Sequence, residues 1–228
     1  MSIRKKILAI SIGPVLVLGV ITLLFMLTMV KSSLMDEVQD ALKGTAAATL
    51  AAYDQNTGDY LESTNGDIWK GSYNISKSES LVDRIKENTG MDVTFFYGNK
   101  RIMTSALDKK GNRILGSEAG ERVVNQVIKG KKPFFSTNVS LDGTRNYGYF
   151  IPVYQNGTTD QVIGMVFVGT NKARKDAIVN KILGSIMMAL LVVMLLCIVT
   201  AMRMAASISK NIKNSVAVVG LSLIHISE

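Results

Sequence analysis

Two uninterrupted apolar runs limit what this 228-residue chain can fold into. Residues 7–30 and residues 182–202 contain no charged side chain, and they help to raise the hydrophobic content to 47%. An α-helix rises about 1.5 Å per residue, so about 20 apolar residues cross a hydrocarbon core of roughly 30 Å. Each run therefore predicts a transmembrane helix, and residues 31–181 form a separate segment between the two helices.

The first run has a second interpretation, because Arg4, Lys5 and Lys6 precede it as in a secretory signal peptide. Such a peptide has an apolar region of about 7 to 15 residues that ends at a cleavage site with small residues. Here the apolar run is longer and continues directly into Lys31 and a helical pattern. We therefore expect an uncleaved membrane anchor, with a signal peptide as the alternative.

Basic residues in the short flanks predict the orientation of the two spans. Three precede the first span, and another three, Arg203, Lys210 and Lys213, follow the second. Residues 31–181 contain 20 basic and 17 acidic residues, so they carry only +3 of the formal net charge of +8. By the positive-inside rule, residues 1–6 and those after 202 are expected in the cytoplasm and residues 31–181 outside it. This is a multi-pass topology of the plasma or inner membrane, and no clustered basic face indicates a nucleic-acid partner.

The segment between the spans lacks the residues of most catalytic and metal sites. It contains no histidine and no cysteine, because Cys197 lies in the second run and His225 lies near the C-terminus. It also lacks a Gly-x-Ser-x-Gly elbow and a phosphate-binding loop. We therefore expect no enzyme, no cofactor, no metal site and no disulfide. A membrane-anchored extracytoplasmic enzyme remains the less favoured alternative.

Residues 221–228, LSLIHISE, are similar to the translation of a transposase adapter used in sequencing libraries. We expect that they do not belong to the natural chain, which would then continue beyond Gly220. On this interpretation His225 is not a natural residue either. A genuine C-terminus is the alternative.

Apolar residues continue past the first span at intervals of three and four, as in one face of an amphipathic helix. They are Leu34, Val38, Ala41, Leu42, Ala46, Thr49, Leu50 and Tyr53. Asn and Gly at residues 56–59 predict the end of this helix. The apolar stripe can pack on its own domain or on a second subunit, so a homodimer is one expectation.

The remaining pattern predicts an α+β domain with a five-stranded antiparallel sheet and helices against one side. Runs with a period of two predict strands at residues 91–97, 101–107, 134–139, 145–154 and 162–169. Two short helices are expected, one capped by Ser78 and closed by Gly90, the other opened by Ser117 and ended by Gly130. Residues 67–71 are expected to form a loop, and a helix from about Asn171 leads into the second span.

Three strings resemble the single Cache (PAS-like) sensor domains of bacterial chemoreceptors and sensor kinases. They are TGMDVTFFYGNKRIMTSAL (89–107), GNRILGSEAGERVVNQVIKGKKPFF (111–135) and YGYFIPVYQNGTTDQVIGMVFVG (147–169). The resemblance covers about residues 35–172. Within residues 203–220, AASISKNIKNSVAVV resembles the first helix of a HAMP linker, although Asn211 stands where that linker usually has proline.

The resemblance implies a small-molecule ligand, and because related domains bind small carboxylates, a carboxylate is the expectation. In citrate- and dicarboxylate-sensing relatives an arginine begins the second strand and a polar residue three positions on lines the pocket. These positions correspond to Arg101 and Thr104. A planar guanidinium can donate two parallel hydrogen bonds to a carboxylate. The relatives have histidine at the second position, so Thr104 argues against a ligand with several carboxylates.

Four aromatic residues complete the candidate ligand site. Tyr147 and Tyr149 enter by their position on the strand before Pro152, and Trp69 and Tyr73 enter as a lid. Each candidate has an alternative role: Arg101 can be a solvated residue after a hairpin, and the aromatic residues can simply pack in the core.

As a whole, the resemblance implies a transmembrane chemoreceptor of the methyl-accepting chemotaxis type. Ligand binding would then be signalled across the membrane to a cytoplasmic module and its chemotaxis signalling proteins. The alternative output is a histidine kinase or a cyclic-dinucleotide enzyme that uses the same kind of sensor.

Overall fold

The computed structural model of the chain describes residues 3–226, without the side chains of residues 3–8, 213 and 216–226. The ends of the expected cytoplasmic N-terminus and of the adapter-like tail, residues 1–2 and 227–228, lie outside the described residues. The chain divides into two compact units. One unit is Leu34–Ile178, and the other combines the residues up to Ser33 with those from Val179 onward.

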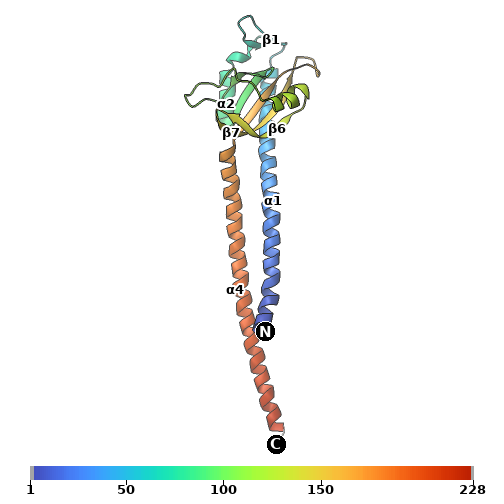
Figure 1. The fold of residues 1–228 in the computed structure, drawn as a ribbon, viewed down its shortest axis with the longest axis vertical. Helices are drawn as coiled ribbons and strands as arrows, with labels where there is room; N and C mark the ends of the chain where they lie inside the picture. Colours follow the sequence, from blue (N-terminus) through green and yellow to red (C-terminus); the bar gives the residue numbers. More distant parts are fainter. Residues whose placement is uncertain (1–2, 227–228) are drawn as a thin grey trace. The chain divides into compact units, whose positions relative to one another are not determined.

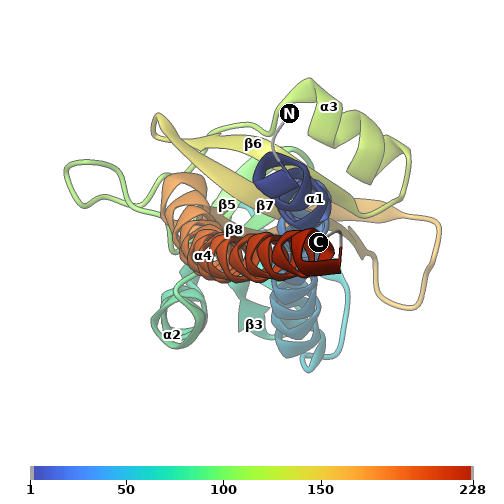
Figure 2. The same cartoon turned by 90° about the horizontal axis from the view of Figure 1, so that it is seen from below.

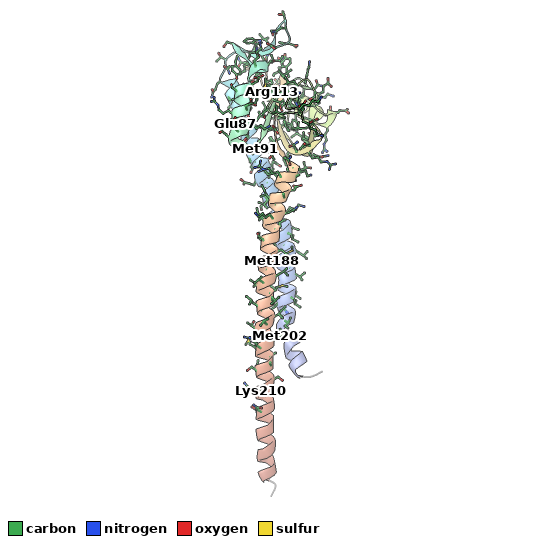
Figure 3. All side chains as sticks on the ribbon, turned by 90° about the vertical axis from the view of Figure 1, so that its left-hand side faces the viewer. Glu87, Met91, Arg113, Met188, Met202 and Lys210 are labelled. Atoms are coloured by element: carbon green, nitrogen blue, oxygen red, sulfur yellow. The ribbon has the colours of Figure 1, made fainter. Side chains whose placement is uncertain are left out.

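Two helices contain the apolar runs (Figure 1): α1, Ile3–Asp54, and α4, Lys172–Ile226. Both are long and apolar enough to cross a membrane. In the unit that holds both runs, Gly19 of α1 packs against Met194 of α4, where a β-carbon on the glycine would overlap the methionine sulfur. Large apolar side chains such as Met188 and Met202 project outward along α4 (Figure 3). This exposure of apolar residues suits a helix that is surrounded by lipid.

The folded unit is built on an antiparallel sheet of five strands in the order β5-β4-β8-β7-β6. The prediction of this sheet is therefore confirmed. The strands are β4 (Asp92–Tyr97), β5 (Lys100–Thr104), β6 (Phe134–Leu141), β7 (Thr144–Tyr154) and β8 (Val162–Asn171).

Helices cover both faces of the sheet, so the expectation of helices against one side is wrong. On one face, α1 and α2 (Glu79–Thr89) pack through Leu42 and Val82 onto Phe95. On the other, α3 (Glu121–Val123) and the π-helix η2 (Val124–Lys129) follow one another, and Val127 packs against that face. Figure 2 shows α2 and α3 on opposite sides of the sheet. Both faces are apolar because alternate residues of each central strand point to opposite faces and both sets are hydrophobic.

The stripe on α1 packs against its own domain. Val38, Leu42, Ala46 and Tyr53 belong to the core beneath the first face of the sheet. The helix ends at Asp54, just before the predicted stop, and Gly58 adopts a positive φ of 110° in the turn that follows. The prediction that the first span continues as an amphipathic helix and ends near residues 56–59 is therefore confirmed.

A second, smaller sheet lies between α1 and α2 in the sequence. It contains β1 (Tyr60–Glu62), β2 (Ile68–Lys70) and β3 (Tyr73–Asn74) in antiparallel order, followed by the 3-10 helix η1 (Ile75–Lys77). The prediction of a loop at residues 67–71 is therefore wrong. A strand of three residues is too short to display a reliable period of two.

The predicted starts and ends of the two short helices are only partly correct. Gly90 ends α2 with a left-handed φ of 68°, as expected, but the hydroxyl of Ser78 bonds to the Ile75 carbonyl and Tyr53 instead of capping α2. The second helix starts after Gly120 and not at Ser117. The chain around Ser117 is extended, because its carbonyl accepts a hydrogen bond from the backbone N–H of Arg101 at the edge of β5.

Candidate ligand-binding site

A cavity of about 340 Å³ lies on the face of the sheet that α3 and η2 cover. Its floor consists of Phe96, Phe150 and Phe167, from β4, β7 and β8. One wall comes from the segment that leads into α3, and the other comes from β6. The remaining lining residues are Arg101, Glu118, Ala119, Gly120, Arg122, Val123, Asn138, Val139 and Ser140.

Two glycines allow the aromatic floor to lie close to the sheet. A β-carbon on Gly148 or on Gly169 would overlap the ring of Phe167. Because neither glycine carries a side chain, the ring of Phe167 packs onto the backbone, and its centroid lies 4.7 Å from that of Phe150. The floor is therefore a buried apolar surface with little polar backbone exposed through it.

Arg101 places a positive charge beside this aromatic floor. It is the second residue of β5, and its exposed fraction is only 8%. Nη1 donates one hydrogen bond of 3.3 Å to the Ile114 carbonyl, and the guanidinium lies 5.4 Å from the centroid of the Phe96 ring. Burial lowers the pKa of Arg101, and the charge of Asp92 partly opposes this shift.

The charge of Arg101 has no counter-ion within the described part of the chain. No carboxylate there lies within 4.0 Å of its guanidinium, and its buried Nε atom has no hydrogen-bond partner. Burying a cation without a partner is costly, because the protein interior does not replace its hydration. The cavity therefore offers a position where an anion would be stabilised.

The other charged lining residues lie at the exposed rim. Arg122 is exposed and its guanidinium lies 5.4 Å from the ring centroid of Phe134. Glu118 is also exposed and forms an antiparallel bridge with Lys100, so this acid faces a basic residue across the edge of the sheet. Among the described residues no group of three or more His, Cys, Asp or Glu side chains is arranged to hold a metal ion.

Of the six predicted site residues, only Arg101 lines the cavity. Thr104 is fully buried, and Thr94, its partner across the strands, is two positions from Phe96, so both threonines share the face of the cavity. The hydroxyl of Thr104 lies 2.7 Å from that of Thr94, donates to the Val93 carbonyl and accepts from the backbone N–H of Ala106. This hydroxyl is therefore saturated by protein groups.

Tyr147 and Tyr149 point to the opposite face of the sheet and belong to the core that contains α1. The hydroxyl of Tyr147 donates to Asp176 near the start of α4 at 2.5 Å, and its ring stacks on Phe135. Burial, together with the bond to Asp176, raises the pKa of Tyr147 to about 12. Both tyrosines therefore pack in this core, and Tyr147 also contacts α4.

Trp69 and Tyr73 lie on β2 and β3 of the smaller sheet. The ring centroid of Tyr73 is 6.3 Å from that of Tyr53 on α1. Neither Trp69 nor Tyr73 lines the cavity. The structure does not bring the four aromatic candidates together with Arg101, and their contact with a ligand stays a prediction.

The sequence argument missed the three phenylalanines of the floor and the rim residue Arg122. Phe96 and Phe150 stand next to buried residues of the opposite face, Phe95 and Tyr149. Only the strand register separates the two sets, because each strand is apolar on both faces. The signal that could have found the floor is the pair Gly148 and Gly169, since glycine inside a strand often marks a place where another group approaches closely.

Part of the chain matches a known family model. Residues 73–182 match the family model described as Single cache domain 3. No curated protein matches the chain. A solved structure, the extracellular ligand binding receptor from Desulfohalobium retbaense DSM5692, is similar over 66% of this chain, with 15% sequence identity and a TM-score of 0.46. This chain covers only 26% of that receptor. The family match and the observed α+β fold together identify the part of the chain that holds the cavity as a Cache domain.

Proposed function

We propose that this chain is the sensor part of a membrane receptor that crosses the bilayer twice and binds a small carboxylate outside the cytoplasm. The ligand would occupy the cavity beside Arg101. The single observation that carries the proposal is the buried guanidinium of Arg101, which has no acidic partner among the described residues and lines a cavity with an aromatic floor.

A carboxylate fits the free hydrogen-bonding capacity of Arg101. Nη1 is engaged with the Ile114 carbonyl, whereas Nε has no partner within the residues that the structure describes. A carboxylate in the cavity accepts charge-assisted N–H bonds from the guanidinium and supplies the missing negative charge. These charge-assisted bonds are stronger than bonds between neutral groups, so a small ligand can gain useful affinity from them.

The signal would leave the domain through β8 and α4. Phe167 on the cavity floor belongs to β8, which ends at Asn171 immediately before α4 begins at Lys172. Tyr147 of the neighbouring β7 holds Asp176 of α4. A ligand that displaces the floor would therefore bias the start of α4, and couplings of about 1–3 kcal/mol are typical of such responses.

The output belongs to the proposal as well. Residues 203–220 would begin a HAMP linker, the receptor would act as a homodimer, and a cytoplasmic module would pass the signal to chemotaxis proteins. A histidine kinase or a cyclic-dinucleotide enzyme is the alternative output. Sequencing the gene past the codon for Gly220 distinguishes these possibilities, because each output module has its own motifs.

Equilibrium binding tests the proposed site. The full chain in lipid nanodiscs is titrated with a panel of small carboxylates, and heat release is recorded for wild type, R101Q and R84Q. Arg84 is an exposed arginine of α2, so R84Q controls for the loss of one positive charge. Wild type and R84Q are expected to bind at least one acid, and R101Q is expected to lose that binding. Equal binding by R101Q would overturn the proposal.

A further inference from the structure

We infer that the cavity selects a monocarboxylate with a flat, uncharged apolar body, of the size of benzoate or phenylacetate. This inference rests on the proposed function, because it takes Arg101 as the partner of the carboxylate. It adds the chemical class of the rest of the ligand.

The charge distribution of the cavity limits the ligand to one negative group. Arg101 is the only buried charged residue in the lining, and the other two, Glu118 and Arg122, are exposed at the rim. A second carboxylate over the floor would lie against phenylalanine rings and would lose its hydration without gaining a buried cation, because the uncharged polar lining residues, Asn138 and Ser140, are exposed on β6. Dicarboxylates are therefore disfavoured relative to monocarboxylates.

The same distribution disfavours an ammonium group on the ligand. Glu118 is the only acidic residue in the lining, it is exposed, and it faces Lys100 across the edge of the sheet. An α-amino acid would place its ammonium within a few bonds of the carboxylate held by Arg101, where the lining offers no buried acid. The free acid without the amino group should therefore bind more tightly than the amino acid.

The floor and one wall determine the shape of the ligand body. The floor presents three aromatic rings, and the wall that leads into α3 contains Ala119 and Gly120, which have little or no side chain and leave room beside these rings. A β-carbon on Gly120 would meet no atom within 4 Å. A flat ring can stack or pack edgewise on such a floor, an arrangement that phenylalanine rings favour with other aromatic groups.

The volume of the cavity determines the size of the ligand. A cavity of about 150 Å³ holds one benzene ring, so about 340 Å³ accommodates a ring together with a carboxylate and a short linker. Acetate would leave most of the floor uncovered and would not gain the apolar contact that a larger body makes there. An acid of the size of benzoate or phenylacetate covers the floor and still reaches Arg101.

The test uses the full chain in nanodiscs and calorimetric titration with named probes. Benzoate and phenylacetate are compared with acetate, succinate, phenylalanine and benzyl alcohol on wild type, R101Q and F150L. We expect the two aromatic acids to bind wild type at least ten times more tightly than every other probe. R101Q should lose the aromatic acids, and F150L should weaken them several-fold because it removes one ring of the floor.

The possible failures are distinguishable. If acetate, succinate or phenylalanine binds as tightly as the aromatic acids and still depends on Arg101, the inference is wrong and the proposed function stands. If the aromatic acids bind R101Q as well as wild type, the proposed function fails. If no aromatic acid binds wild type, the inference is wrong whatever the variants do. Thermal melting followed by the fluorescence of Trp69, the only tryptophan, verifies that each variant is folded.

Discussion

Arg113 connects the segment between β5 and the cavity wall to α2. Its Nη1 and Nη2 atoms donate to the two carboxylate oxygens of Asp83 at 2.9 Å and 2.6 Å, and Nη1 also donates to the Thr104 carbonyl at 2.7 Å. The next residue, Ile114, supplies the carbonyl that accepts from Arg101. Arg113 (labelled in Figure 3) therefore fixes the segment that positions Arg101, although its own side chain does not line the cavity.

Replacing Arg113 by lysine should weaken both the fold and the site. A lysine ammonium cannot hold both oxygens of Asp83 and the Thr104 carbonyl in the planar arrangement of a guanidinium. Because the Asp83 side chain is 44% exposed, solvent screening limits the expected loss of unfolding free energy to about 1–2 kcal/mol. Urea denaturation of R113K, with R84K on α2 as the control for an arginine-to-lysine change, measures this loss. An unfolding free energy equal to that of R84K would contradict the assignment.

The pH dependence of stability gives a second test of this ion pair. The hydrogen bond from Arg113 holds the pKa of Asp83 below its ordinary value. A carboxyl with a lowered folded-state pKa contributes stability above its unfolded-state pKa, about 3.9, and this stability is lost as the pH falls through the folded-state pKa. Wild type should therefore be more stable than D83N at about pH 6, and the difference should shrink as the pH falls below about 3.9. A constant difference over this range would argue against the pair.

At the residue scale, the sequence predicts one buried lining residue of the cavity, Arg101, but not its surroundings. Arg101 is predicted because it matches a position in related domains and because a guanidinium can donate two parallel hydrogen bonds to a carboxylate. The faces of Tyr147, Tyr149 and Phe150 could not be assigned, since the strand that carries them is apolar on both sides. A period of two identifies a face only when the other face is polar. In this sheet, the register observed in the structure is what separates the cavity from the opposite core.

At the scale of elements, the end of α1 is joined to the smaller sheet. Lys70 on β2 is almost completely buried, and its ammonium lies 3.4 Å from Asp54, the last residue of α1, and 3.2 Å from the Gly58 carbonyl. The ring of Tyr60 packs 4.2 Å from the same ammonium, and its hydroxyl donates to Asp54. These contacts attach the helix to β1 and β2.

The two members of the Lys70–Asp54 pair should differ in their mutational cost. The side chain of Lys70 is 3% exposed and that of Asp54 is 49% exposed. D54N leaves a buried ammonium without its anion, so we expect it to lower the unfolding free energy by about 1–3 kcal/mol. K70M leaves an acid that water can solvate and fills the same space, so its cost should stay below about 1.5 kcal/mol. Urea denaturation of both variants compares the costs, and a larger loss for K70M would refute this assignment.

Local signals at helix ends and helix starts differ in how well they predict the elements. Gly90 ends α2 because glycine readily adopts the left-handed conformation that ends a helix, and this signal depends on a single residue. Ser117 resembled a helix cap, yet its segment pairs with β5 instead. A capping signal competes with any strand edge that has free N–H and C=O groups, and the sequence does not show which edge lies nearby.

The contact between β7 and α4 predicts a variant that separates binding from coupling. Y147F keeps the ring against Phe135 and removes the hydroxyl that donates to Asp176. Because Tyr147 lies on the face opposite the cavity, carboxylate affinity should remain unchanged. Amide hydrogen exchange at residues 172–178 should become faster, since the first turns of α4 lose an anchor on the sheet. A large drop in affinity instead would place Tyr147 in the ligand site, as the sequence argument expected.

At the scale of the whole molecule, the topology decides whether the Cache domain can sense solutes outside the cytoplasm. The basic flanks predict that residues 31–181 are exported and that residues after 202 are cytoplasmic. Two helices are long and apolar enough to cross a membrane, which is the structural condition for this arrangement. The orientation itself requires a measurement in cells.

Cysteine labelling of intact cells supplies that measurement, because Cys197 is the only cysteine of the chain. In a C197A background, N112C and K210C each place one thiol on an exposed position, the first in the Cache domain and the second after the second span. A membrane-impermeant maleimide should label N112C in intact cells and K210C only after permeabilisation. An N-terminal tag that remains on the membrane-bound chain distinguishes an anchor from a cleaved signal peptide. If K210C is labelled first, the cavity faces the cytoplasm and the receptor would report on internal carboxylates instead.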